Sequence, residues 1–215
     1  MSAELRITEI FYSLQGEART MGRPTVFVRL TGCPLRCQYC DTEYAFNGGN
    51  MMTISDIVAE VQSFRCPLVT VTGGEPLAQP GARQLMAELA EAGLEVSLET
   101  SGAMDIADID ERVSVVMDLK TPDSGELARN RMENIALLQH KDQVKFVICS
   151  RQDYEWARMK LDEFQIAERV SEVLFSPSYD EQTLSQLAAW VLEDRLPVRV
   201  QLQMHKLIWG DKPGV

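Results

Sequence analysis

Three cysteines lie within eight residues of this chain, in the segment Cys33-Pro-Leu-Arg-Cys37-Gln-Tyr-Cys40. The spacing is C-x3-C-x2-C, no fourth cysteine is near, and the two histidines, His140 and His205, are distant in sequence. A structural zinc site needs four protein ligands, whereas cysteine thiolates are the usual ligands of iron–sulfur clusters. The segment therefore predicts that the three cysteines hold a 4Fe–4S cluster and leave one iron open for small-molecule chemistry.

Other uses of the cysteines agree less well with the sequence. The chain has five cysteines, an odd number, and nothing else in it indicates secretion, so disulfides are not expected. A zinc site that borrows His205 or Asp41 remains an alternative. Cys66 and Cys149 lie in apolar runs, and we expect both to be small buried residues rather than ligands.

Length and charge limit the class of protein. A chain of 215 residues is expected to form one domain, residues 1–215, with a sizeable core. Its formal net charge is −11 and no basic stripe is visible, which argues against nucleic-acid binding. No apolar run approaches the roughly 20 residues of a membrane span, and residues 1–4 begin no signal peptide. We expect a cytoplasmic protein without nucleic-acid or membrane partners.

Strand and helix patterns alternate along the chain. Strands are expected at residues 6–12, 25–30, 68–72, 95–99, 113–119, 143–148, 173–175 and 198–203. Helices are expected at residues 53–64, 81–92, 129–139, 153–164 and 181–193, and a loop at 43–52. This order predicts an α/β protein with a parallel sheet and right-handed crossovers. About six of these strands belong to the alternating strand–helix units, too few to close an eight-stranded barrel, so a partial α/β barrel fits the count.

Polar motifs follow five of the expected strands. They begin at Cys33, Gly73, Thr100, Lys120 and Ser176, each directly after a strand or within a few residues of its end. Ligands of parallel α/β sheets bind at the carboxyl ends of the strands. The five loops are therefore expected to meet at one rim and to form one site.

Two of these motifs together resemble a known superfamily. The cysteine segment after an apolar strand, with Gly-Gly-Glu-Pro at 73–76 after a second strand, resembles the radical S-adenosylmethionine enzymes. Within them, Ser-Leu-Gln-Gly-Glu at 13–17 and Cys-Asp-Thr at 40–42 resemble the family that makes 7-carboxy-7-deazaguanine. The resemblance covers residues 11–206 and implies a partial parallel barrel of the radical S-adenosylmethionine type.

The resemblance also implies a set of cofactor contacts. Gly74 lets the backbone approach a ligand because it has no β-carbon, and Glu75 offers an acceptor for an ammonium group. Tyr39 matches the aromatic position that packs on adenine, and a hydrophobic residue of the loop is the alternative. Residues 118–121 depart from the expected serine-containing form. The implied S-adenosylmethionine contacts are Tyr39, Cys40, Asp41, Gly74, Glu75, Lys120, Ser176, Pro177, Ser178 and Tyr179.

A second implied set binds Mg²⁺ and the substrate. Thr42 supplies the oxygen ligand that Mg²⁺ prefers; from the residues alone, a threonine-capped turn is the simpler interpretation. Arg29 interrupts an apolar strand and can hold a carboxylate with two hydrogen bonds, or it can form a structural ion pair. The implied substrate contacts are Leu14, Gln15, Gly16, Glu17, Arg29, Thr72 and His205. No residue is assigned a catalytic role beyond binding.

The activity that the resemblance implies is that of a homodimeric lyase. It converts 6-carboxy-5,6,7,8-tetrahydropterin to 7-carboxy-7-deazaguanine with loss of ammonia, for queuosine and other deazapurines, and takes electrons from a flavodoxin or ferredoxin. The tail, Leu-Ile-Trp-Gly-Asp-Lys-Pro-Gly-Val, departs from the family's short ending in proline. The alternatives are a glycyl-radical activating enzyme, which acts on a protein, and a non-enzymatic iron–sulfur or zinc-binding protein.

Overall fold

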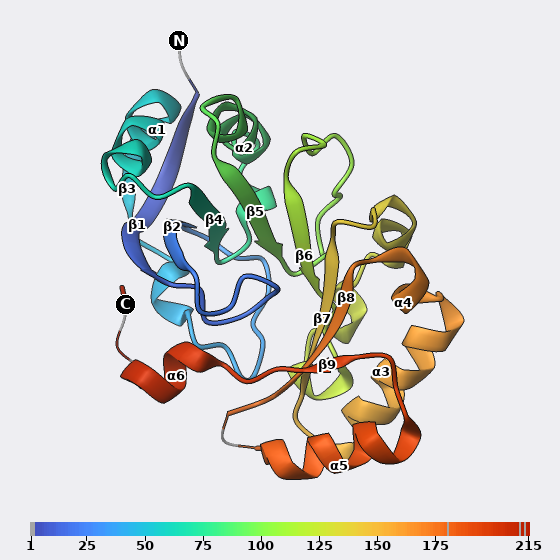
Figure 1. Cartoon of the computed structure of the whole chain (residues 1–215). Helices are drawn as coiled ribbons and strands as arrows, with labels where there is room; N and C mark the ends of the chain where they lie inside the picture. The colour runs from blue at the N-terminus through green and yellow to red at the C-terminus, as the bar shows by residue number, and fades with distance from the viewer. Residues whose placement is uncertain (1–2, 180, 211, 213) are drawn as a thin grey trace.

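One mixed sheet organises the molecule. The computed structural model describes residues 3–179, 181–210, 212 and 214–215. In this part of the chain nine strands form one sheet in the order β3-β1-β2-β4-β5-β6-β7-β8-β9 (Figure 1). The strands are β1 (Glu4–Leu14), β2 (Pro24–Leu30), β3 (Asn50–Thr53), β4 (Leu68–Gly73), β5 (Glu95–Thr100), β6 (Ser114–Asp118), β7 (Gln143–Ile148), β8 (Glu172–Pro177) and β9 (Arg199–Val200).

Helices cover the outer face of the curved sheet (Figure 1). They are α1 (Ile54–Ser63), α2 (Ala82–Glu91), α3 (Arg151–Glu163), α4 (Ile166–Arg169) and α5 (Leu184–Asp194). A sixth helix, α6 (Met204–Trp209), lies near the C-terminus and apart from them (Figure 1). The sequence encodes their starts: Thr53 caps α1 by accepting the backbone N–H of Asp56 at 3.2 Å, and Ser150 caps α3 through Asp153. None of the described helices is long and apolar enough to cross a membrane.

The two faces of the sheet carry different residues because successive side chains of a strand point to opposite sides. On the outer face Val28, Val71, Leu98, Met117 and Phe146 are fully buried and belong to the hydrophobic core. Their neighbours in sequence point to the inner face, are polar or charged, and line a cavity. These residues are Arg29, Thr72, Glu99, Asp118 and Lys145. One face of the sheet therefore builds the core, and the other builds the site.

The expected parallel sheet is confirmed for β2 and β4–β9, in which all neighbouring strands pair in parallel. At the other edge, β1 runs antiparallel to both β2 and β3. No helix separates β1 from β2, and strands joined by a short connection pair antiparallel. The result is an incomplete barrel extended by an antiparallel edge.

Two expectations in the first two thirds of the chain are wrong. Residues 129–139 are not an α-helix but 3-10 turns, Leu127–Arg129 and Met132–Leu137. The side chain of Asn134 is buried and donates to the carbonyls of Gly102 and Met104, at 3.0 and 2.8 Å, which ties this segment to the loop after β5. The expected loop at 43–52 contains a 3-10 turn, Glu43–Ala45, and strand β3, which pairs with β1.

The C-terminal part also differs from expectation. The helix expected at 181–193 begins only at Leu184, where Thr183 is the N-cap residue. The strand expected at 198–203 is limited to the two residues of β9, and α6 follows. His205, expected at a strand end, therefore lies in the first turn of α6. Asp211 and Pro213 of the tail lie outside the described residues.

Candidate active site

A cavity of about 540 Å³ opens at the carboxyl ends of the parallel strands, on the inner face of the sheet. It brings together nearly all of the site residues expected from the sequence. Those lining it are Leu14, Gln15, Gly16, Glu17, Arg29, Cys33, Cys37, Tyr39, Cys40, Asp41, Thr42, Thr72, Gly74, Lys120, Ser178, Tyr179 and His205. Glu75, Ser176 and Pro177 are buried nearby but do not line it.

Arg36, within the cysteine loop, stabilises the loop through two contacts. The Arg36 guanidinium donates to the carbonyl oxygen of Cys33 at 2.8 Å and lies 4.2 Å from the centre of the Phe46 ring. Burial raises the pKa of the Cys37 thiol to about 11 and also raises that of Cys33. Ligand thiols bind metal as thiolates, so formation of a metal centre here releases protons.

The ligands for a single metal ion are not preassembled. No three His, Cys, Asp or Glu side chains of the described residues are placed to hold one ion. His205 Nε2 lies 4.0 Å from Asp41 Oδ2, and neither group completes a four-ligand set with the cysteines. A 4Fe–4S cluster makes a different demand, because each thiolate binds its own iron, and three thiols lining one cavity fit it.

Glycine allows the loop after β4 to pack directly on the cysteine loop. A β-carbon at Gly74 would lie 2.2 Å from the carbonyl oxygen of Gly32 and 2.8 Å from Cys33 Cβ, far inside van der Waals contact. Gly73 has a φ of +142°, which side chains rarely adopt. The two glycines therefore place the backbone of this loop beside the cysteines.

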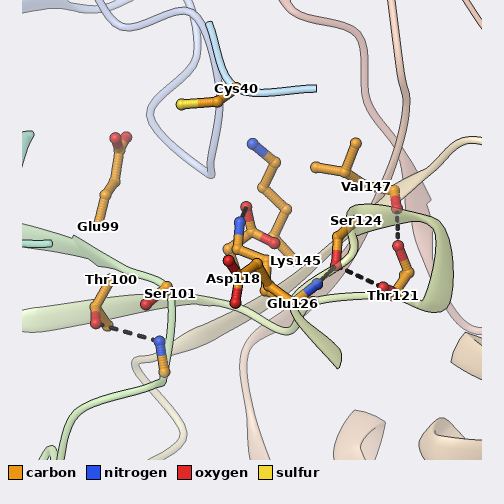
Figure 2. Close-up of polar contacts among 12 residues, drawn as sticks. Cys40, Glu99, Thr100, Ser101, Asp118, Thr121, Ser124, Glu126, Lys145 and Val147 are labelled. Atoms are coloured by element: carbon orange, nitrogen blue, oxygen red, sulfur yellow. Dashed lines mark hydrogen bonds and ion pairs between the residues drawn. The ribbon is translucent and has the colours of Figure 1, made fainter. Parts of the chain in front are cut away.

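The Glu75 side chain links two loops by hydrogen bonds. Its carboxylate is fully buried and accepts hydrogen bonds from Leu77 N (3.1 Å), Thr100 Oγ1 (2.9 Å) and Ser101 N (2.8 Å). These bonds join the loop after β4 to the loop after β5. Figure 2 shows Thr100 and Ser101 next to Glu99 at the end of β5, and both line the cavity.

Two buried polar atoms of the cavity have no hydrogen-bond partner among the described residues. They are the Tyr39 hydroxyl and Asp118 Oδ1. Asp118 Oδ2 pairs with Lys120 Nζ at 3.0 Å, and that ammonium lies 5.6 Å from the centre of the Tyr39 ring. Burial opposes the charge of Lys120, yet Asp118 keeps its pKa raised. Unpartnered buried polar atoms are costly, so this arrangement fits a polar ligand.

A second cluster of polar side chains lines the cavity between the end of β1 and β7. The Glu17 carboxylate forms an ion pair with Lys145 and accepts from Gln203 Nε2 at 3.0 Å. Gln15 Nε2 and Thr72 Oγ1 donate to the two oxygens of Glu99, at 3.2 and 2.8 Å. Burial would raise the pKa of Glu17, but Lys145 lowers it below the ordinary value. Burial and the charge of Glu17 raise the pKa of Glu99.

Arg29 and Thr42 stand on the side of the cavity formed by β1 and β2. Arg29 Nε donates to Glu9 Oε1 at 2.7 Å, and the Tyr44 hydroxyl donates to the same oxygen at 2.8 Å. The ion pair considered for Arg29 is therefore present, and it uses one of the five N–H donors of the guanidinium. Thr42 precedes the 3-10 turn Glu43–Ala45, but its side chain makes no capping hydrogen bond.

The C-terminal arm, residues 201–210, holds the segment after β1. Met204 N donates to the Gly16 carbonyl at 3.1 Å, and the Gln201 side chain exchanges two hydrogen bonds of 2.9 Å with the backbone of Ala18. A β-carbon at Gly16 would lie 2.2 Å from His205 Nδ1, so only glycine permits this approach. Burial lowers the pKa of His205 although Glu17 and Asp41 oppose the shift.

Several charged or polar cavity residues were not expected from the sequence as site residues, among them Glu99, Asp118, Lys145 and Gln203. Glu99 and Lys145 face the same space as Cys40 (Figure 2). A signal for two of them does exist. Lys145 interrupts the otherwise apolar run at residues 144–148, as Arg29 interrupts its strand, and Glu99 lies near the carboxyl end of its strand. A buried charge needs a partner.

Comparisons with known proteins agree with this geometry. The profile of the Radical SAM superfamily matches residues 27–145, more than half of the chain. The fold and the cysteine-lined cavity are thus those of a radical S-adenosylmethionine enzyme. A 7-carboxy-7-deazaguanine synthase of Koribacter versatilis is 44% identical, covering 95% of this chain and 97% of its own. That of Chlorobaculum tepidum is 43% identical, covering 99% and 98%.

The chain belongs to the 7-carboxy-7-deazaguanine synthase family. The crystal structure of QueE from Escherichia coli shows the same fold, with a TM-score of 0.73, 21% identity, and coverage of 94% of this chain and 95% of that chain. The expected radical S-adenosylmethionine class, the partial barrel and the family are therefore confirmed. The glycyl-radical activating enzyme and the non-enzymatic protein are not favoured.

Proposed function

We propose that this enzyme converts 6-carboxy-5,6,7,8-tetrahydropterin to 7-carboxy-7-deazaguanine with loss of ammonia, on the path to queuosine or another deazapurine. The observation that carries the proposal is that one cavity joins two kinds of residue. Three cysteines line it at the loop after β2, and Gln15, Glu17 and Arg29 line it beside β1. A cofactor at the first set and a pterin at the second are within one enclosed space.

Cys33, Cys37 and Cys40 would hold the 4Fe–4S cluster, and the backbone at Gly74 would lie beside the methionyl group of S-adenosylmethionine. When bound, cluster and S-adenosylmethionine supply a carbon radical, formed by one-electron reduction, that removes hydrogen from the substrate. The unpartnered atoms of Tyr39 and Asp118 offer hydrogen bonds to the polar groups of the nucleoside. The protein encloses the reacting atoms and excludes water from them.

The substrate contacts follow from charge. Glu17 offers an ionised acceptor to the amino and N–H groups of the pterin ring, and the donors that Arg29 has beyond Glu9 can reach its carboxylate. Thr72 fixes Glu99 beside them at 2.8 Å. Thr42 would bind Mg²⁺ because its hydroxyl lines the cavity and is not used as a helix cap.

Three further parts of the proposal come from the family. The enzyme works as a homodimer, receives its electron from a flavodoxin or ferredoxin, and acts in the cytoplasm, where a reducing environment suits the cluster. It uses no nucleic acid as substrate, in agreement with a net charge of −11.

The test is anaerobic turnover with the carboxylated pterin and with the analogue that lacks its carboxylate. Wild type should lose more than about tenfold in kcat/KM on the analogue, because a charged hydrogen bond is worth more than about 1.4 kcal/mol. Arg29→Ala should lose this discrimination. Equal turnover of both compounds by wild type, or reaction with a peptide substrate alone, would overturn the proposal.

A further inference from the structure

The ion pair between Lys145 and Glu17 joins two parts of the chain that are far apart in sequence. Lys145 is on the inner face of β7 and Glu17 follows β1; their side chains are only 11% and 13% exposed. Gln203, from the C-terminal arm, donates to the other carboxylate oxygen at 3.0 Å. Both oxygens of Glu17 are thus held, one by a cation and one by an amide.

This arrangement leaves Glu17 able to bind a ligand. A carboxylate has about four lone-pair positions, and the two bonds use two of them. Its backbone is fixed as well, since Glu17 N donates to Gln15 Oε1 at 3.2 Å. The carboxylate is therefore held in one orientation in the cavity, and it can accept a hydrogen bond from a ligand without losing the bonds to Lys145 and Gln203.

Lys145 is also the cation placed between two carboxylates. Glu99 on β5 faces the same space, and the groups around the pair are Asp118 on β6, His205 on α6 and, on the side of Glu99, Arg29 on β2. Two buried carboxylates close to one another favour a shared proton unless a cation compensates. Without an ammonium at this position, burial would raise the pKa of Glu17, as it already raises that of Glu99.

We propose that Lys145 is a positioning residue of the reaction: together with Gln203 it fixes Glu17 as an ionised acceptor for the amino and ring N–H groups of the pterin. This rests on the proposed function, because it takes the pterin as the group that Glu17 binds. Lys145 acts through Glu17 and need not touch the substrate.

The experiment measures binding rather than turnover. The cluster-containing enzyme is titrated by calorimetry with 6-carboxy-5,6,7,8-tetrahydropterin at pH 6 and pH 8, under anaerobic conditions without reductant. Four proteins are compared with wild type: Lys145→Met, Lys145→Gln, Lys145→Arg and Lys160→Met. Lys160 is the matched control, a lysine that pairs with Glu163 at 2.6 Å on α3, outside the cavity.

The ratio of Kd at pH 6 to Kd at pH 8 should be about tenfold larger in Lys145→Met and Lys145→Gln than in wild type. In these variants Glu17 gains a proton as the pH falls, and a carboxyl pKa raised by about two to three units crosses this range. Lys145→Arg and Lys160→Met should keep the wild-type ratio. The titration of the ligand is common to all proteins and cancels in the comparison. Loss of the Lys145 charge raises the pKa of His205, and a protonated His205 would favour ionised Glu17, so this change opposes the predicted effect.

The outcomes separate the two proposals. An unchanged ratio in both neutral variants, with any loss of affinity equal at the two pH values, would overturn the role of Lys145 and leave it a structural residue. Lys145→Gln keeps a hydrogen-bond donor, so the ratio of the two Kd values can be measured on this variant if Lys145→Met does not fold. Wild type that binds no pterin at either pH would instead overturn the proposed function.

Discussion

At the scale of single residues, the end of the cysteine loop presents two kinds of ligand side by side. Cys40 Sγ and Thr42 Oγ1 are 3.9 Å apart and both face the cavity. Thiolates suit iron–sulfur clusters, whereas a hydroxyl oxygen suits Mg²⁺. Two residues separated by one position can therefore serve two different metals, and substitutions should separate their roles.

We expect Cys37→Ala to lose the cluster and all cleavage of S-adenosylmethionine, whereas Thr42→Ala should keep wild-type iron and sulfide. Thr42→Ala should instead lose most of the stimulation of turnover by Mg²⁺. Cys66→Ala is the control, because Cys66 is buried outside the cavity and donates to the Pro24 carbonyl at 3.2 Å. Iron and sulfide analysis with anaerobic assays measures all three. A fully active Cys37→Ala enzyme, or an unchanged Mg²⁺ dependence in Thr42→Ala, would contradict these assignments.

At the scale of elements, the site depends on loops that pack on one another at the strand ends. The loop after β4 lies against the cysteine loop at Gly74, and Glu75 ties it to the loop after β5. The C-terminal arm similarly holds the segment after β1 through Gln201 and Met204. A small change in one of these loops should therefore move residues of its neighbour.

Replacement of Gly74 by alanine should lower both the melting temperature and the iron content. Its β-carbon would lie 2.2 Å from backbone of the cysteine loop, so that loop must shift. Gly93→Ala is the matched control: its φ is +83°, but a β-carbon there meets no atom within 4 Å. It should cost about 1–2 kcal/mol, the strain of an alanine at positive φ, and leave iron content unchanged. Equal iron content in the two variants would show that the close approach at Gly74 is not needed for the cluster.

At the scale of the whole molecule, the inner face of the sheet buries charge that the outer face could not accommodate. Outer positions pack on helices and are apolar, while inner positions hold Glu99 and Lys145 among other polar groups. Buried charges are compensated by partners or by shifted pKa values. The pH dependence of folding stability should therefore report on the cavity.

Glu99→Gln should reduce the loss of stability between pH 5 and pH 8. Burial raises the pKa of Glu99 above its ordinary value of 4.5, so the folded enzyme keeps this proton where the unfolded chain has released it. Stability then falls as the pH rises from about 4.5 toward the folded pKa. Urea unfolding midpoints at matched cluster content measure the slope. Burial also raises the pKa of Asp153. This group is present in wild type and in Glu99→Gln, so it does not account for a difference between their pH profiles. Parallel pH profiles would contradict the prediction.

The sequence alone determined features that depend on local patterns. The cysteine spacing, the Gly-Gly-Glu-Pro segment and the strand boundaries near 25–30, 68–72 and 143–148 were readable because they depend on residues close together in the chain. The common rim of the loops also followed, since parallel strands place their carboxyl ends at one edge. The 3-10 turns at 127–137 were not predictable, because Asn134 finds its partners some 30 residues away.

Only the tertiary structure decided which charged residues meet. Lys145 and Glu17 are 128 residues apart in sequence, and Gln203 joins them from the last part of the chain. The alternation of residues shows that Lys145 points away from the apolar face of β7, but it does not show which residues Lys145 contacts on the inner face. That depends on how the sheet curves and where the C-terminal arm lies, and both are set by packing between elements that are distant in sequence.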